Sequence, residues 1–213
     1  MKKILSVLLI IVITLSYSTA AFAAVKAGNE AELLEYVGKI EAQPGLLTAE
    51  DGTTTEIAGE LVSAHMVGDN RVACTYAYDV TLPKGTGSTT EQDTDQSVSI
   101  RAYNTVEWDT TKVNGYTHCL LTRVSGSWVY LDQQVTVTNC AIQYMCWGVG
   151  TSGTASQTGS KPSVNNNYSY ATGFTKNVQI PSMGLLICQK QTFSLKRGGS
   201  TWTFVLDNTP YAA

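Results

Sequence analysis

Hydrophobic residues occupy every second position along two long stretches of the chain, 72–82 and 98–108, with Asn104 as the one polar exception. In both, apolar and aromatic side chains alternate with mostly polar ones. Because successive side chains of a β-strand point to opposite faces, each stretch predicts a strand with one buried face. An antiparallel pairing with Val80 opposite Ile100 keeps every apolar position of the two strands on the same side of the sheet.

A tight hairpin is predicted near the C-terminal end, where Gly198 and Gly199 separate two alternating runs. Glycine accepts the positive φ that both central residues of a type I′ turn require, so a two-residue primed turn is expected. This turn sets Leu195 opposite Trp202 on an apolar face. The same register predicts four further pairs, namely Phe193 with Phe204, Gln191 with Leu206, Lys196 with Thr201 and Ser194 with Thr203.

Other segments are rich in Val, Thr, Tyr, Trp and Leu, which favour strands. They are 116–123, 128–131, 135–147, 178–180 and 185–188. Ser125-Gly126-Ser127 is predicted to turn the first of these into the second. The segment 148–175 is dense in Gly, Ser, Thr and Asn, and it is predicted to be a long surface excursion. Together these patterns predict an antiparallel β-sandwich of about eight or nine strands.

The N-terminal part of the chain has a different pattern. Lys2 and Lys3 precede an aliphatic run, and Ala21-Phe22-Ala23 offers a small-residue cleavage site, so residues 1–23 are predicted to be a secretory signal peptide. A short helix is expected over Asn29–Ala42, with Asn29 as its N-cap. Residues 24–56 are therefore predicted to be a helical arm, and residues 57–213 the β-sandwich domain.

The net charge of the chain limits the classes of molecule that it is expected to bind. Loss of Lys2 and Lys3 with the signal peptide turns the 14 basic and 17 acidic residues of the chain into 12 and 17, a net charge of −5. A net acidic chain predicts no nucleic-acid partner. No later segment has the roughly 18 apolar residues that span a bilayer, so no membrane span is expected in the mature chain.

The charges are unevenly distributed along the mature chain. Residues 24–109 hold 5 basic and 15 acidic side chains, whereas residues 110–213 hold 7 and 2. Such asymmetry is compatible with self-association through complementary patches. The favoured interpretation is that strands from the two halves interleave in one fold, so that their fields largely cancel.

Five cysteines follow the signal peptide: Cys74, Cys119, Cys140, Cys146 and Cys188. Export permits disulfides, so all five are candidates for two bridges with one thiol left over. The alternative is that they are buried thiols that act as small hydrophobic side chains. Cys140 and Cys146 cannot bond to each other on one straight strand, because six residues separate them by about 20 Å.

Few residues are candidates for catalysis. A nucleophilic dyad or triad would need His65 or His118, and the chain has no Gly-x-Ser-x-Gly motif. Glu107 and Asp109 share a strand face, which is compatible with glycoside hydrolysis but also with two solvated carboxylates. No catalytic residue is predicted.

Metal-binding patterns are equally sparse. Asp93 and Asp95, in the acidic loop between the first two predicted strands, are weak candidates for calcium. Zinc-type Cys-x-x-Cys spacing is absent. No metal site and no cofactor are therefore predicted.

Aromatic residues give the remaining indication of a binding surface. Tyr144 and Trp147 precede the polar excursion, and Tyr168 and Tyr170 lie within it. Tyrosine among Ser, Gly and Asn is typical of binding loops, and sugar rings stack on such side chains. The alternative is that these four residues close the hydrophobic core.

We therefore predict a secreted, extracellular bacterial protein that binds a protein or a glycan and is not an enzyme, with its loops as the contact region. Three alternatives stay open at this point. The first is a carbohydrate-binding module that uses Tyr144, Trp147, Tyr168 and Tyr170. The second is a structural subunit of a surface assembly, and the third is a secreted hydrolase centred on His65 or His118.

Overall fold

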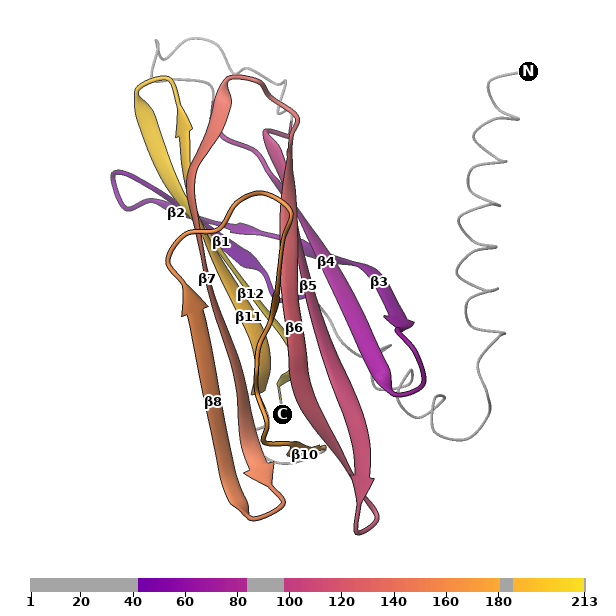
Figure 1. Ribbon diagram of the computed structural model, residues 1–213. Coiled ribbons are helices and arrows are strands. Elements are labelled where there is room, and N and C mark those ends of the chain that lie inside the picture. Colours follow the sequence, from indigo (N-terminus) through magenta and orange to yellow (C-terminus); the bar gives the residue numbers. More distant parts are fainter. Residues whose placement is uncertain (1–41, 84–97, 181–185, 213) are drawn as a thin grey trace, which may run out of the picture. The chain divides into compact units, whose positions relative to one another are not determined.

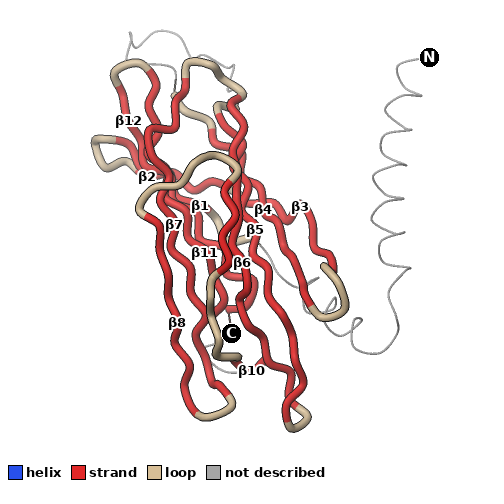
Figure 2. The backbone as a smooth tube through the Cα atoms, viewed as in Figure 1, coloured by secondary structure: helices blue, strands red, loops and turns tan. Residues whose placement is uncertain are grey.

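The computed structural model describes residues 42–83, 98–180 and 186–212 (Figure 1). All regular secondary structure in these residues is β-strand (Figure 2). The strands are β1 (Gly45–Ala49), β2 (Thr54–Ile57), β3 (Gly59–Met66), β4 (Arg71–Val80), β5 (Ile100–Val113), β6 (Tyr116–Tyr130), β7 (Val135–Gly150), β8 (Gly153–Lys161), β9 (Tyr168–Ala171), β10 (Val178–Ile180), β11 (Leu186–Arg197) and β12 (Ser200–Ala212).

The strands form one antiparallel sheet in the order β2-β1-β12-β11-β7-β10-β6-β5-β4-β3, with β8 added to β7 and β9 added to β6. The predicted mainly antiparallel β class is confirmed. The strand number is twelve rather than eight or nine, because β1, β2, β9 and β10 contain only five, four, four and three residues. Strands this short are too brief to show a clear alternation in the sequence.

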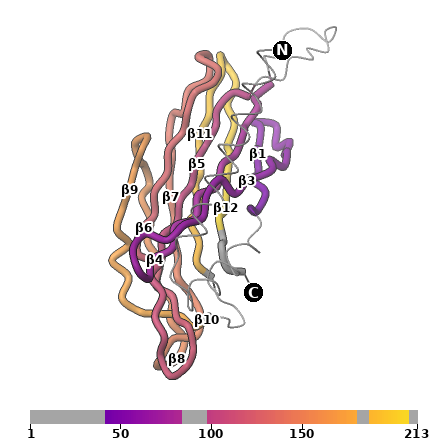
Figure 3. The backbone as a smooth tube through the Cα atoms, turned by 90° about the vertical axis from the view of Figure 1, so that its right-hand side faces the viewer, coloured from indigo at the N-terminus to yellow at the C-terminus, as the bar shows by residue number. Residues whose placement is uncertain are grey.

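The sheet folds over so that two parts of it face each other, as in a sandwich. The first layer is β3-β4-β5-β6-β9, and the second layer is β8-β7-β11-β12-β1-β2; β10 pairs with both β6 and β7. In Figure 3, β3 and β4 run obliquely across the strands behind them. Two aromatic contacts join the layers, between Tyr78 and Phe204 with ring centroids 6.0 Å apart and between Trp128 and Phe193 at 5.6 Å.

The two long predicted pairings have the expected register. Val80 pairs with Ile100 between β4 and β5, and all five predicted pairs occur between β11 and β12. The tight turn between β11 and β12 differs in one detail, because only Gly198 has a positive φ, of 58°. Positive φ at the first central residue alone is the pattern of a type II′ turn rather than type I′.

The predicted turn at Ser125-Gly126-Ser127 is wrong, because β6 continues through it. Gly126 pairs with Asn104 of β5 on one side and with Tyr168 of β9 on the other. A Cβ atom on Gly126 would lie 2.5 Å from the hydroxyl oxygen of Tyr168 and 2.7 Å from the carbonyl oxygen of Tyr103. Glycine at this position allows neighbouring atoms to lie close to the strand backbone. In a single sequence, a glycine with this role looks the same as a glycine in a turn.

The predicted surface excursion over 148–175 is also wrong in part, since most of this segment belongs to the sheet. β7 runs to Gly150, and β8 pairs with it along its whole length. Among the described strands, β8 has a partner on one side only, so it is an edge strand. Polar side chains are common on edge strands and do not require burial there. Farther along, β9 pairs with β6 and places Tyr168 in the interior, with 6% of its surface exposed.

All five cysteines are free thiols and all are buried, so the predicted disulfides are wrong and the alternative of small buried side chains is correct. Cys140 and Cys146 both lie on β7, where a direct bond was excluded by their spacing. The other three lie on β4, β6 and β11.

Several predictions fall outside the described residues. These are the signal peptide over 1–23, the helix over 29–42 apart from Ala42, and the calcium candidates Asp93 and Asp95. β1 and all of β2 except its last residue, Ile57, lie within the 24–56 segment, and both strands belong to the sheet. No helix long and apolar enough to cross a membrane occurs in the described part of the chain.

Candidate functional site

The outward face of the first layer carries a row of hydroxyl groups. Strand register aligns four residues across it, one each from β4, β5, β6 and β9: Thr75, Thr105, Ser125 and Ser169, which we call the hydroxyl row. Neighbouring strands lie about 4.8 Å apart, so the four residues follow one another across the face at roughly that backbone spacing. Their sequence neighbours Cys74, Val106 and Val124 point inward and are fully buried.

A shallow trough of about 440 Å³ follows the hydroxyl row. It is lined by Thr75, Tyr103, Thr105, Ser125, Gly126, Ser127, Asn167 and Tyr168. Tyr103 and Ser127 face each other across β5 and β6, one step along the strands from the row. The trough is therefore a feature of the sheet face, formed by rigid strands with one loop residue, Asn167, at its edge.

Hydrogen bonding within the trough is incomplete. The hydroxyls of Thr75 and Thr105 bond to each other at 2.9 Å. By contrast, the side-chain hydroxyls of Tyr103, Ser125 and Ser127 make no hydrogen bond to any described residue. A hydroxyl both donates and accepts, so these three groups are available to a bound polar molecule.

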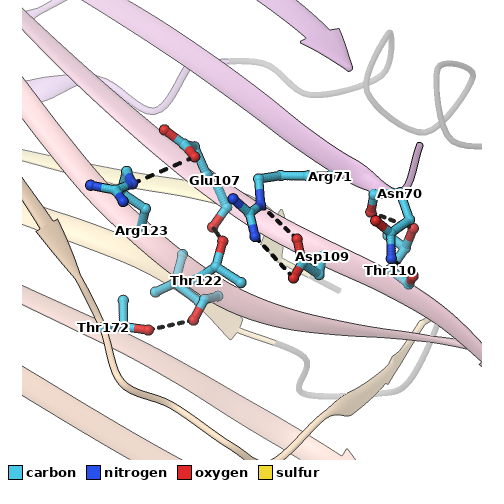
Figure 4. A network of polar contacts seen from close by, with 9 residues as sticks. Asn70, Arg71, Glu107, Asp109, Thr110, Thr122, Arg123 and Thr172 are labelled. Carbon is cyan, nitrogen blue, oxygen red and sulfur yellow. Dashed lines mark hydrogen bonds and ion pairs between the residues drawn. The ribbon is translucent and has the colours of Figure 1, made fainter. Parts of the chain in front are cut away.

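Ion pairs occupy the face at one end of the trough (Figure 4). Arg71 of β4 donates two hydrogen bonds to Asp109 of β5, from Nε at 2.6 Å and from Nη2 at 3.2 Å. This hydrogen bonding raises the pKa of Arg71 above its usual value. Beside it, Arg123 of β6 lies 3.8 Å from Glu107 and donates to the hydroxyl of Ser169 at 2.9 Å. These contacts tie β4, β5, β6 and β9 together.

A second set of ion pairs occupies the other end. Arg101 of β5 lies 3.0 Å from Glu60 of β3 and 3.5 Å from Asp79 of β4. Its guanidinium carbon is also 5.8 Å from the ring centroid of Tyr103, a cation–π contact. The guanidinium thus lies beside the aromatic ring that lines the trough.

Buried polar side chains support the floor of the trough from inside. Nδ2 of Asn104 donates to Oε1 of Gln191 at 2.9 Å, across the two layers. Nε2 of Gln189 donates to the hydroxyl of Tyr168, which lies over Gly126. All three of Asn104, Gln189 and Gln191 are completely buried. The backbone beneath the trough is therefore held to the second layer by polar contacts as well as by packing.

The four predicted aromatic residues do not form one surface. Tyr168 lines the trough and stacks on Tyr170 at 5.9 Å, with Lys161 Nζ 5.3 Å from the Tyr170 ring centroid. Tyr144 faces the interior of the second layer, 7% exposed, and contacts Phe174 at 5.7 Å. Trp147 lies on the outward face of β7, 38% exposed.

The trough residues Tyr103, Ser125 and Ser127 were missed by the sequence analysis. For Tyr103 the available signal was its place on the polar side of the alternation in 98–108, whereas Ser125 and Ser127 lay in the segment predicted to be a turn. A polar face becomes a candidate site only when the neighbours of each strand are known.

A second hollow of about 490 Å³ lies on the outward face of the second layer. Its lining includes Cys188, Lys190, Asp207 and Thr158. Burial raises the pKa of the Cys188 thiol to about 12, so the thiol is protonated at neutral pH and is a poor nucleophile.

The residues proposed for hydrolysis do not converge. His118 is buried, with Nδ1 3.2 Å from the carbonyl oxygen of Tyr116, and His65 is exposed on β3. Glu107 and Asp109 each pair with a different arginine, Arg123 and Arg71. No group of three or more His, Cys, Asp or Glu side chains in the described residues is arranged to hold a metal ion.

Comparison with known protein families, with curated proteins and with solved structures finds no match to this chain.

Proposed function

We propose that the chain is an exported, non-enzymatic binding protein whose contact surface is the trough on the first layer. The observation that carries this proposal is the set of uncommitted hydroxyls of Tyr103, Ser125 and Ser127. They lie between ion pairs whose charged groups already have partners. Groups that are rigidly positioned but make no internal bond are suited to an external ligand.

A non-enzymatic role is favoured by the environments of the candidate catalytic side chains. Glu107 and Asp109 each form an ion pair with an arginine, Arg123 and Arg71, which favours a structural role for both carboxylates. Burial raises the pKa of Cys74, Cys140 and Cys188 to about 12, and a protonated thiol is a weak nucleophile. Export is supported by the basic start, aliphatic run and small-residue cleavage site of residues 1–23.

The proposal predicts that binding depends on the trough and not on the opposite layer. The mature protein is labelled and applied to an array that contains neutral glycans, anionic glycans and extracellular peptides. We expect at least one ligand class to lose about tenfold or more in affinity on Tyr103→Ala, as for a well-packed aromatic contact. Trp147→Ala, on the outward face of the second layer, is the matched control and should bind as the wild type does.

Equal binding by the wild type and by Tyr103→Ala, Ser125→Ala and Ser127→Ala variants would contradict the proposal. Loss of binding on Trp147→Ala alone would move the contact surface to the second layer.

A further inference from the structure

We propose that the ligand of the trough is a neutral, polyhydroxylated chain, that is, a neutral glycan. This inference rests on the proposed function, and it adds the chemical class of the ligand. It is argued from the charge of the face, from its hydrogen-bonding groups and from the position of the trough within the sheet.

The charged groups beside the trough all take part in ion pairs with one another. Three arginines and four carboxylates surround it, and each is within ion-pair distance of an opposite charge: Arg71 with Asp109, Arg123 with Glu107, and Arg101 with Glu60 and Asp79. An anionic ligand would lie beside the carboxylates, and a cationic ligand would have to compete with the arginines. A neutral ligand meets neither cost, so it is electrostatically complementary to this face.

The uncommitted groups of the trough match sugar hydroxyls. Tyr103, Ser125 and Ser127 present hydroxyls, each of which both donates and accepts a hydrogen bond. A sugar hydroxyl has the same dual capacity, so either partner of such a pair can act as the donor. Tyr103 adds an aromatic ring of the kind on which the apolar face of a sugar packs.

The position of the trough disfavours an extended peptide. Peptides often bind a sheet by adding a strand at an open edge, where backbone N–H and C=O groups are unpaired. β5 pairs with β4 and β6, and the stretch of β6 beneath the trough pairs with β5 and β9. The strands under the trough thus offer side chains rather than backbone groups to a ligand.

The trough also extends across the strands, because its lining includes Thr75 of β4, Thr105 of β5, Ser125 of β6 and Tyr168 of β9. Neighbouring strands lie about 4.8 Å apart, so an extended chain laid across them would meet side chains from several strands in turn. Several weak contacts of this kind add up over a polymer, whereas a single small sugar would use only a few of them.

Affinity gel electrophoresis of the full mature protein tests the inference. The gels contain either a neutral polysaccharide (a mixed-linkage β-glucan, xylan, galactomannan or dextran) or an anionic one (polygalacturonate or hyaluronan). We expect retardation by at least one neutral polysaccharide, with little change between low and high salt, since the ligand carries no charge. Retardation by none of the neutral polysaccharides would overturn the glycan inference.

Three variants locate the contact. Tyr103→Phe and Ser127→Ala each remove one uncommitted hydroxyl, and we expect roughly threefold to tenfold weaker binding, equivalent to one lost hydrogen bond. Trp147→Ala should be retarded as strongly as the wild type. Urea unfolding midpoints equal to that of the wild type show that a loss of binding is not a loss of fold.

The experiment distinguishes failure of the neutral-glycan inference from failure of the proposal that the trough is the binding surface. Binding only to an anionic polysaccharide or to a peptide, still lost in Tyr103→Ala, overturns the neutral glycan and leaves the trough as the binding surface. Binding to a neutral polysaccharide that none of the trough variants changes, with their fold intact, overturns both.

Discussion

Asn104 on β5 and Gln191 on β11 join the two layers of the sandwich through a hydrogen bond of 2.9 Å, and both side chains are completely buried. Asn104 also pairs with Gly126 in the strand register, directly beneath the trough. A buried polar bridge at this point makes the position of the trough floor depend on the second layer. Because unpaired buried amides are costly, the bridge also disfavours sliding of one layer over the other.

Replacement of Asn104 by leucine should lower the free energy of unfolding by about 1–3 kcal/mol, because Oε1 of Gln191 then loses its buried donor. The double variant Asn104→Leu/Gln191→Leu should lose less than the sum of the two single variants, since neither partner is left unpaired. Urea denaturation monitored by tryptophan fluorescence measures all four proteins. Strict additivity of the single losses would show that the two amides are not coupled.

The substitution Gly126→Ala should destabilise the protein by about 1–3 kcal/mol, because the added methyl group meets the hydroxyl of Tyr168 and the backbone of Tyr103. Gly199→Ala is the matched control. A Cβ atom there has no neighbour within 4 Å, and the residue is not in the left-handed region. We expect a change within about 0.5 kcal/mol for this control. Equal midpoints for the two variants in urea would show that Gly126 is not sterically required.

Stability should fall as the pH rises from about 9 toward 12. Burial raises the pKa of Cys74, Cys140 and Cys188 from 9.0 to about 12 in the folded protein. In this window the unfolded chain binds fewer protons than the folded one, so the free energy of unfolding decreases, by up to about 1.4 kcal/mol per pH unit for each thiol. Urea midpoints at pH 8 and pH 10 measure the slope, which should be shallower in Cys74→Ala. An identical slope in that variant would show that this thiol does not contribute.

Thiol reagents should find no reactive group in the native protein at neutral pH, because all five cysteines are buried. After unfolding without reductant, five thiols should react per chain. Quantitative titration with a chromogenic disulfide reagent gives both numbers. A count of three or one in the unfolded state would show that the protein forms disulfides after all.

Gln157 should protect the segment that follows β9 from proteolysis. Its Oε1 accepts hydrogen bonds from the backbone N–H groups of Thr175 at 2.7 Å and Lys176 at 3.0 Å, and its Nε2 donates to the Lys176 carbonyl at 2.7 Å. Gln157→Ala removes all three bonds and should speed tryptic cleavage after Lys176 several-fold, because cleavage requires local opening. Gln157→Glu keeps the acceptor oxygen but loses the donor, so its cleavage rate should lie between those of the wild type and Gln157→Ala.

Cleavage after Arg197, in the β11–β12 hairpin, provides the internal reference for that experiment. A parallel rise in cleavage at both sites would indicate global destabilisation and not release of the 175–176 segment.

The long strand pairings were predictable because they depend on local periodicity. Alternation in 72–82 and 98–108 and the glycine pair at 198–199 were sufficient to set Val80 opposite Ile100 and Leu195 opposite Trp202. A shift of one residue would have moved every apolar side chain to the wrong face, so few registers compete.

Other local patterns gave wrong predictions because the structure that they adopt depends on residues distant in the sequence. Gly126 has the composition of a turn, yet it remains in β6 because Tyr168, 42 positions later, occupies the space of its missing side chain. The polar segment after Gly148 became an edge strand because β7 was available as a partner. The cysteines matched a disulfide pattern, and only the tertiary structure shows that all five are buried free thiols.

From its residue order alone the chain determined which side chains face inward along each long strand, because that choice requires only the two-residue period of the backbone. The tertiary structure decided which strands became neighbours, and hence that Thr75, Thr105, Ser125 and Ser169 align as one row beside Tyr103. A binding surface on a sheet is made across strands, where neighbouring residues are far apart in sequence. Packing of the two layers sets that arrangement, and no local pattern encodes it.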